Sequence, residues 1–182
     1  MDLDKNGFID TYDQMAIGGT ENPEIVYGFG VNLRWKELDF GAMFQGIGRT
    51  WRILSSNIMP ASNKGSMYNI FDNYQDRWTV DNQSQDVFYP RADYGPNANN
   101  SQKSTWWLRN MSFLRLKNLE LGYSCPKKWL QGFVISNARV FVRGTNLLTF
   151  SKFNLWDPEL ATGDGAKYPA MKSVSVGFDI TF

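Results

Sequence analysis

The 182-residue sequence contains no histidine and only one cysteine, Cys125. Without histidine it has no His-dependent catalytic triad, no imidazole general base and no His-ligated zinc site. A single cysteine cannot form a disulfide within the chain. No spacing of carboxylates marks out a catalytic pair, so we expect no enzyme and no catalytic residues.

The sequence also lacks a long apolar run and a strong net charge. No stretch of about 18 apolar residues occurs, so no transmembrane helix is predicted, although a membrane β-barrel gives no such signal. A net charge of +1 creates no field that would attract nucleic acid, and we expect no nucleic-acid partner. Aromatic residues make up 15% while the mean hydropathy is −0.41, which fits alternating strands better than a solid apolar core.

What the sequence does contain is period-two alternation of apolar and polar residues, which is typical of β-strands. Residues 24–35 carry apolar side chains at every odd position and small or polar ones at most even positions. A short turn at Lys36-Glu37 leads into a return arm, so a hairpin is predicted over residues 24–49. Further strands are predicted at residues 106–124, 137–150 and 173–182.

Residues 50–105 show no sustained period and are rich in Asn, Ser, Asp and Gln. Such a long stretch is unusual in a compact soluble domain, whereas outer-membrane barrels have long external loops and short periplasmic turns. The sequence therefore predicts an all-β fold, an antiparallel meander that forms the last five or so strands of a large transmembrane β-barrel. Residues 1–23 would be an extracellular loop, and residues 24–182 the C-terminal barrel strands with 50–105 as a long external loop.

Five strands cannot close such a barrel alone. An open edge in hydrocarbon leaves backbone groups unpaired at several kcal/mol each, and bacterial single-chain barrels have an even number of strands, from about eight upwards. The chain also begins without the basic and apolar regions of an export signal. We therefore expect a fragment that belongs to a larger barrel.

Connection lengths predict how the strands lie in a bilayer. If the short turns are periplasmic, residues near that interface form an aromatic girdle, and others lie near the opposite interface. The first group is Trp35, Tyr123, Trp129 and Phe182, and the second is Tyr27, Phe44 and Phe150.

Two charges disturb the third long strand. Arg115 and Lys117 share a face with Leu119 and Leu121. A Lys or Arg on the lipid face costs roughly 2–4 kcal/mol at the midplane. We expect either a β-bulge near Lys117-Asn118 that swaps the faces, or snorkelling at the outer interface.

Short motifs run through nearly the whole chain, and their order and spacing together are specific. On these motifs the chain resembles the C-terminal part of the SusC/RagA family of TonB-dependent outer-membrane transporters. The matching stretches are Asp4 to Asp10 with Asp13, Ile17 to Gly19, Asn22-Pro23, Tyr27 to Phe29, Phe44 to Gly46, Asp76 to Thr79, Ser112 to Asn118, Leu121 to Tyr123, Arg143 to Phe150, Asp157 to Glu159 and Gly177 to Phe182.

The resemblance implies a barrel of about twenty-two strands with a plugged lumen. Such transporters import oligosaccharides or peptides with energy delivered through TonB, and a SusD-like surface lipoprotein caps the barrel. The implied partners are outer-membrane lipids, the rest of the barrel and plug, that lipoprotein, TonB through an N-terminal part that this sequence lacks, and the barrel-assembly machinery. The resemblance also implies an assembly signal at Val176, Phe178, Ile180 and Phe182.

An acidic stretch at the beginning has the spacing of an EF-hand-type calcium loop. Oxygen donors stand at positions 1, 3, 5, 7, 9 and 12, with Gly7 at position 6, where the loop turns sharply. The alternative is an acidic surface turn held by Asx hydrogen bonds. The expected ligands are Asp2, Asp4, Asn6, Phe8 through its carbonyl, Asp10 and Asp13.

Six aromatic residues lie in or beside the long loop. Flat aromatic faces stack on sugar rings, so substrate contacts are one interpretation, and packing within the loop or an interface belt is the other. These residues are Trp51, Trp78, Tyr89, Tyr94, Trp106 and Trp107.

One alternative fold fits the same alternation. In a soluble, secreted, carbohydrate-binding β-sandwich with a calcium loop, the apolar faces of the strands would pack inward against each other. The two folds differ in what covers the apolar faces.

Overall fold

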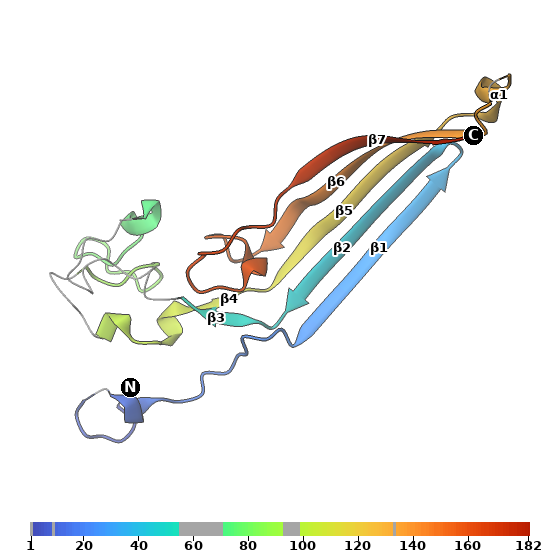
Figure 1. Ribbon diagram of the computed structural model, residues 1–182. Helices are drawn as coiled ribbons and strands as arrows, with labels where there is room; N and C mark the ends of the chain where they lie inside the picture. Colours follow the sequence, from blue (N-terminus) through green and yellow to red (C-terminus); the bar gives the residue numbers. More distant parts are fainter. Residues whose placement is uncertain (1, 9, 55–70, 93–98, 133) are drawn as a thin grey trace.

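The computed structural model describes residues 2–8, 10–54, 71–92, 99–132 and 134–182. Five long strands form one antiparallel sheet in which every strand pairs with its neighbours in chain order (Figure 1). The strands are β1 (Ile25–Trp35), β2 (Leu38–Gly48), β5 (Phe113–Ser124), β6 (Asn137–Ser151) and β7 (Ser173–Thr181). The predicted meander is therefore confirmed.

Short elements lie at the two ends of this sheet. At the end of the sheet where β2 ends and β5 begins lies a two-stranded sheet of β3 (Trp51–Ile53) and β4 (Leu108–Asn110). At the opposite end, the short helix α1 (Lys127–Leu130) connects β5 to β6. Within the described ranges, no helix is long and apolar enough to cross a bilayer. The 3₁₀ turns are η1 (Thr11–Asp13), η3 (Asp72–Gln75), η4 (Asn99–Ser101), η5 (Thr105–Trp107) and η6 (Pro158–Leu160).

Strict pairing gives the large sheet one apolar and one polar face. In the β1–β2 hairpin, Phe29 pairs with Phe44 and Leu33 with Phe40, while Asn32 pairs with Gly41. Because side chains alternate along a strand, these pairs lie on opposite faces. The rings of Phe29 and Phe44 stack with their centroids 5.1 Å apart.

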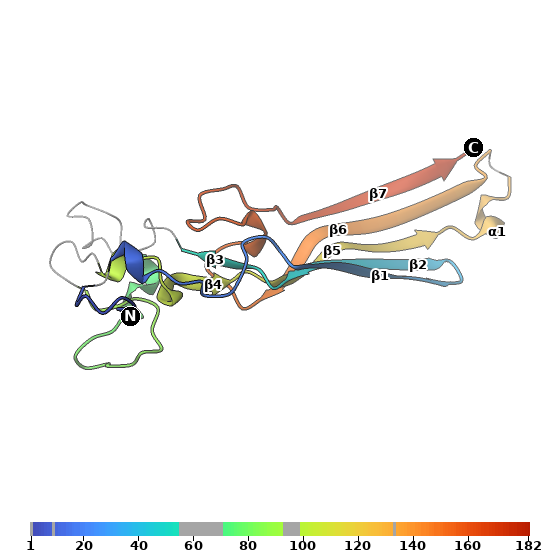
Figure 2. The same cartoon turned by 90° about the horizontal axis from the view of Figure 1, so that it is seen from below.

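The apolar face is not covered by any other described element, and the strands of the sheet form one curved layer (Figure 2). Val176 is 73% and Phe178 75% exposed, which is the reverse of the core position that a sandwich requires. The sandwich alternative is therefore wrong, because no second sheet packs against the apolar face in the described part of the chain.

The predicted β-bulge is present. Asn118 pairs with Met43 and Leu116 with Phe44, so Lys117 is an extra residue without a partner on β2. One extra residue reverses the alternation of the strand beyond it. Leu116 thus joins the apolar face, and Arg115 moves to the polar face, where only 2% of the residue is exposed.

Two details of the predicted strands are wrong. Residues 106–124 are not one strand, because β4 and β5 are separated at Met111-Ser112, where Ser112 donates its backbone N–H to the Asn110 side chain at 2.8 Å. β3 lies within the stretch predicted to be loop. Both short strands continue the β2–β5 pairing after a break that is bridged by a hydrogen bond of 2.9 Å from Met111 N to the Thr50 carbonyl.

Candidate functional site

A network of charged side chains crosses the polar face of β2, β5, β6 and β7. Arg139 donates to Asp39 through Nε at 3.0 Å and to Glu120 at 2.6 Å, and it lies 3.4 Å from Asp179. Arg143 donates to the other oxygen of Glu120 at 2.6 Å. Fixed, mutually paired charges of this kind require water or protein beside them, and they would be costly against lipid. This is therefore the face that turns away from hydrocarbon.

Small residues make room for that network. Added side-chain carbons at Gly122 and Gly177 would meet Arg139 and Phe141, respectively. The guanidinium carbons of Arg139 and Arg143 lie over the Phe141 ring, 5.0 and 5.2 Å from its centroid. Phe141 is thus a platform for both arginines.

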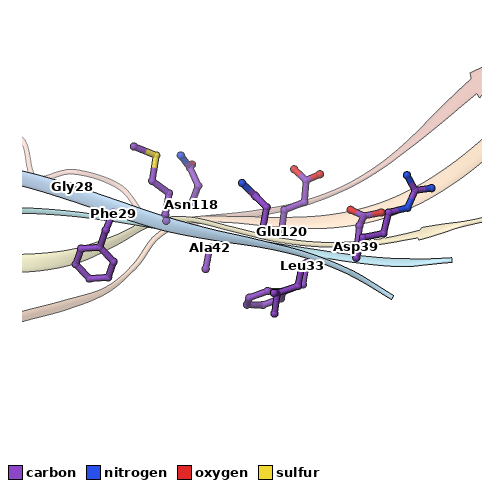
Figure 3. A pocket seen from close by; sticks show the side chains of 13 residues that line it. Gly28, Phe29, Leu33, Asp39, Ala42, Asn118 and Glu120 are labelled. Atoms are coloured by element: carbon purple, nitrogen blue, oxygen red, sulfur yellow. The ribbon is translucent and has the colours of Figure 1, made fainter. Parts of the chain in front are cut away.

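Next to the network, a hollow of about 750 Å³ extends along β1, β2 and β5. Asp39, Asn118 and Glu120 project from the sheet on the side opposite to Phe29, Leu33 and Ala42 (Figure 3). Glycines contribute to its lining on the polar face and leave the backbone accessible there: Gly28, Gly30 and Gly41.

A second ion cluster fixes the β6–β7 loop to the polar face of β5. The buried guanidinium of Arg115 pairs with Asp157 and, at 3.0 Å, with Glu159, and Lys117 reaches Glu159 at 2.9 Å. Asp157 also caps η6 by accepting the Glu159 backbone N–H at 3.0 Å. We call this cluster of Arg115, Lys117, Asp157 and Glu159 the loop latch. Sequence analysis predicts no pairing for these four residues, because Arg115 and Asp157, like Lys117 and Glu159, are 42 positions apart.

Above the loop latch, the long loop and the β6–β7 loop share one apolar core. Its buried members are contributed by both loops, and Leu155 and Trp156 pack against them. Burial raises the pKa of the Tyr89 phenol to about 12. The buried residues are Leu54, Tyr89, Trp107, Met111 and Phe153.

The six aromatic residues proposed as substrate contacts have different surroundings. Tyr89 and Trp107 are each 1% exposed, so the packing interpretation fits these two and their rings offer no free face. Trp51, Trp78 and Trp106 are partly exposed, and Tyr94 lies outside the described residues. Among these, Trp106 is held by its indole N–H, which donates to the Phe88 carbonyl at 3.0 Å.

The acidic stretch forms a closed turn that brings together three of its six predicted ligands. One oxygen each of Asp2, Asp4 and Asp13 lies within 4.8 Å of the others. Asp10 instead caps η1 at Tyr12 N, at 2.8 Å, and the Phe8 side chain is exposed.

Hydrogen bonds within the turn bear on both interpretations. Backbone N–H groups of Asp10 and Leu3 donate to the Asp13 carboxylate and hold its pKa below the usual range. Asn6 donates to Asp4 at 3.0 Å and accepts from Phe8 N at 2.8 Å. The buried Oδ1 of Asp2 has no hydrogen-bond partner. Asx bonds are thus present, and the carboxylate grouping fits a hard cation such as Ca²⁺.

The residues proposed as an assembly signal lie along β7 and just beyond it. Val176, Phe178 and Ile180 project from the apolar face, and Phe182 is 81% exposed. Their exposure suits contact with lipid. Recognition by the assembly machinery stays a prediction.

No protein-family model matches the chain. It is 31% identical over 196 residues to TonB-dependent receptor P26 of Formosa agariphila, an alignment that covers 100% of this chain and 19% of that protein. It is also 33% identical over 81 residues to TonB-dependent receptor SusC of Bacteroides thetaiotaomicron, covering 43% of the chain and 8% of SusC.

Solved structures agree with these sequence relatives. A structure of the RagAB peptide importer in the "closed-closed" state matches with a TM-score of 0.72 and 32% identity over 97% of this chain and 20% of that chain. The "open-open" state matches with a TM-score of 0.70 and 34% identity over 88% of this chain and 17% of that chain. The chain thus spans about a fifth of the length of the curated relatives that it matches end to end. The relatives are named as receptors and importers, which agrees with the expectation that the chain is no enzyme.

Proposed function

We propose, from its membership of the SusC/RagA family of TonB-dependent receptors of the Gram-negative outer membrane, that this chain forms part of the barrel wall of a nutrient importer. The observation that carries the proposal is the two-faced sheet. Its apolar face carries exposed apolar side chains on each of the five strands, and its polar face carries paired charges. A wall between lipid and an aqueous lumen needs this division.

Substrate and partners follow from the same relationship. We propose that the complete protein imports oligosaccharides or peptides, that a SusD-like lipoprotein covers its outer mouth, and that TonB supplies the energy. The RagAB structures are titled as those of a peptide importer, and SusC is a TonB-dependent receptor. Within this chain, the apolar core joining two loops above the loop latch supplies a rigid rim on which a lid could close.

Uptake by whole cells tests this proposal. The gene that encodes the full-length receptor is deleted, and growth is measured on defined oligosaccharides and on peptides as sole carbon source. We expect growth to fail on one of these classes and to return when the gene is restored. Deletion of the gene for the proposed SusD-like lipoprotein should impair growth on the same class. Unchanged growth on every substrate would overturn the proposal.

We further propose calcium as the ion for the acidic turn, with Asp2, Asp4 and Asp13 as its carboxylate ligands. Calorimetry with CaCl₂ on the full-length receptor should give a binding heat that the Asp2→Ala/Asp4→Ala variant lacks. Asp81→Ala, an exposed carboxylate outside the turn, is the control and should bind as the wild type does. Equal heats in all three proteins would leave only the Asx-bonded surface turn.

A further inference from the structure

A separate cavity lies in the long loop, outside the apolar core. It has a volume of about 410 Å³, within the range of ligand sites. The loop segments that line it lie beyond the end of the sheet opposite α1 (Figure 1). Phe88 and Trp106 form its floor, because both also pack against the core. The other lining residues are Asp76, Gln85, Asp86, Val87 and Arg109.

The floor and one wall of this cavity are held in place by the loop itself. The Trp106 indole N–H donates to the Phe88 carbonyl at 3.0 Å, and Phe88 N donates to the Asp76 carboxylate at 3.1 Å. Arg109 donates to the Trp106 and Leu108 carbonyls, with its guanidinium carbon 5.1 Å from the centre of the Phe88 ring. Groups that are fixed before binding lose little entropy when a ligand arrives.

The charges of the cavity indicate what it accepts. Arg109 forms no salt bridge with any described carboxylate, and its partial burial lowers its pKa. Asp76 and Asp86 bring two negative charges to this single positive one, so an anionic ligand would be repelled. Carboxylate, carboxamide and guanidinium groups together suit neighbouring hydroxyls, which both donate and accept.

We propose that this cavity is a subsite for one neutral sugar unit of a glycan, with Trp106 as the stacking surface. Asp86 and Gln85 accept hydroxyl protons there, and Arg109 donates to ring or hydroxyl oxygens. The apolar face of a pyranose covers the indole, as flat aromatic surfaces allow. The subsite rests on the proposed importer function and narrows its substrate to a glycan.

Binding to the purified full-length receptor tests the subsite. The probes are maltotetraose, cellotetraose, mannotetraose and xylotetraose, with tetra-alanine as the peptide comparison, and affinity is measured by calorimetry. We expect one sugar to bind, and Asp86→Ala and Trp106→Phe to weaken it about tenfold each, because each removes one polar contact or part of a stacking surface. Asp86 is exposed, so its replacement leaves the fold intact. Asp81→Ala, on the same loop but outside the cavity, should not change the affinity.

The outcomes separate the subsite from the importer function. Sugar binding that is equal in wild type, Asp86→Ala and Trp106→Phe would overturn the subsite while uptake by cells continues. Binding of tetra-alanine that these two substitutions weaken would make it a peptide subsite instead. Absence of binding by all four sugars at millimolar concentration would also overturn it. Loss of the importer function itself would appear only in the growth measurements.

Discussion

Arg115 couples the barrel wall to the loops through a single side chain. Its guanidinium is removed from water and is matched by the carboxylates of Asp157 and Glu159. A buried charge is expensive to leave unpaired, so each partner depends strongly on the other. Lys117 is more exposed and adds a weaker pair to Glu159.

Replacing Arg115 should therefore loosen the β6–β7 loop. We expect Arg115→Met to cost about 3–5 kcal/mol, since it leaves the largely buried Asp157 carboxylate without a cation, whereas Glu159 keeps Lys117. Lys117→Met, which breaks only the more exposed pair, should cost about 0–1 kcal/mol. The measurement is the rate of proteolysis within residues 152–172 of the full-length receptor in detergent. Equal cleavage rates in the two variants would contradict the role of the loop latch.

For single residues, the sequence predicts which face of the sheet a side chain lies on better than it predicts the residues that this side chain contacts. The conflict at Arg115 is visible in the sequence, because a cation among leucines violates the alternation. Its resolution through Asp157 and Glu159 depends on how a loop folds back over the sheet, and no local pattern contains that information. Similarly, Tyr89 and Trp107 look like candidate stacking residues until tertiary packing encloses them.

Among the elements, β5 is the one in which a single residue sets the chemistry of a whole strand. Lys117 is the extra residue of the bulge. Before it the even-numbered residues of β5 lie on the apolar face, and after it the odd-numbered residues do. The alternation of β1 and β7 needs no such correction, and the hairpin turn at Lys36-Glu37 lies where the sequence predicts it.

Deleting Lys117 should therefore disrupt folding much more than substituting it. Without the bulge, Arg115 would turn toward the apolar face at a cost of roughly 2–4 kcal/mol at the midplane, and the loop latch would be lost as well. Lys117→Ala keeps the residue count and is the matched control. The readout is the folded, heat-modifiable fraction in outer membranes. Similar fractions for deletion and substitution would show that the bulge does not set the register.

The β1 strand provides a direct comparison of the two faces. Val31 lies on the apolar face and its neighbour Asn32 on the polar face. We expect Val31→Arg to destabilise the full-length barrel in lipid vesicles by about 2–4 kcal/mol, and Asn32→Arg to have an effect near zero. Denaturant unfolding followed by tryptophan fluorescence measures both. A larger loss from Asn32→Arg would reverse the assignment of the faces.

For the molecule as a whole, the decisive features are its open edges and uncovered face. β1 and β7 each pair with one strand only among the described residues, although both are long and regular. Unpaired edges of this length are costly in hydrocarbon, so the proposed barrel wall requires partner strands along both β1 and β7. The alignment of this chain with only a fifth of its relatives agrees with that requirement.

The architecture of this wall can be predicted from sequence because it depends on a period of two, which each strand displays independently. The structure of the rim cannot be predicted in this way, because β3, β4 and the loop core are held by contacts between residues far apart in the chain. One example is the hydrogen bond of 2.9 Å from Leu54 N to the Trp107 carbonyl. The charge network on the polar face is intermediate. Its members are recognisable as lumen residues, but their pairing through Arg139 requires the register across four strands.

The most direct test of the account is the accessibility of β7 in a membrane. In a full-length receptor with Cys125 replaced by serine, single cysteines are placed at residues 173–180 except Gly177 and are spin-labelled in lipid vesicles. Collisions with oxygen, which concentrates in lipid, should peak at Val174, Val176, Phe178 and Ile180, whereas a water-soluble nickel complex should reach Ser173, Ser175 and Asp179. A profile without alternation, or with oxygen and nickel in the opposite phase, would contradict the claim that the apolar face of the sheet lies against lipid.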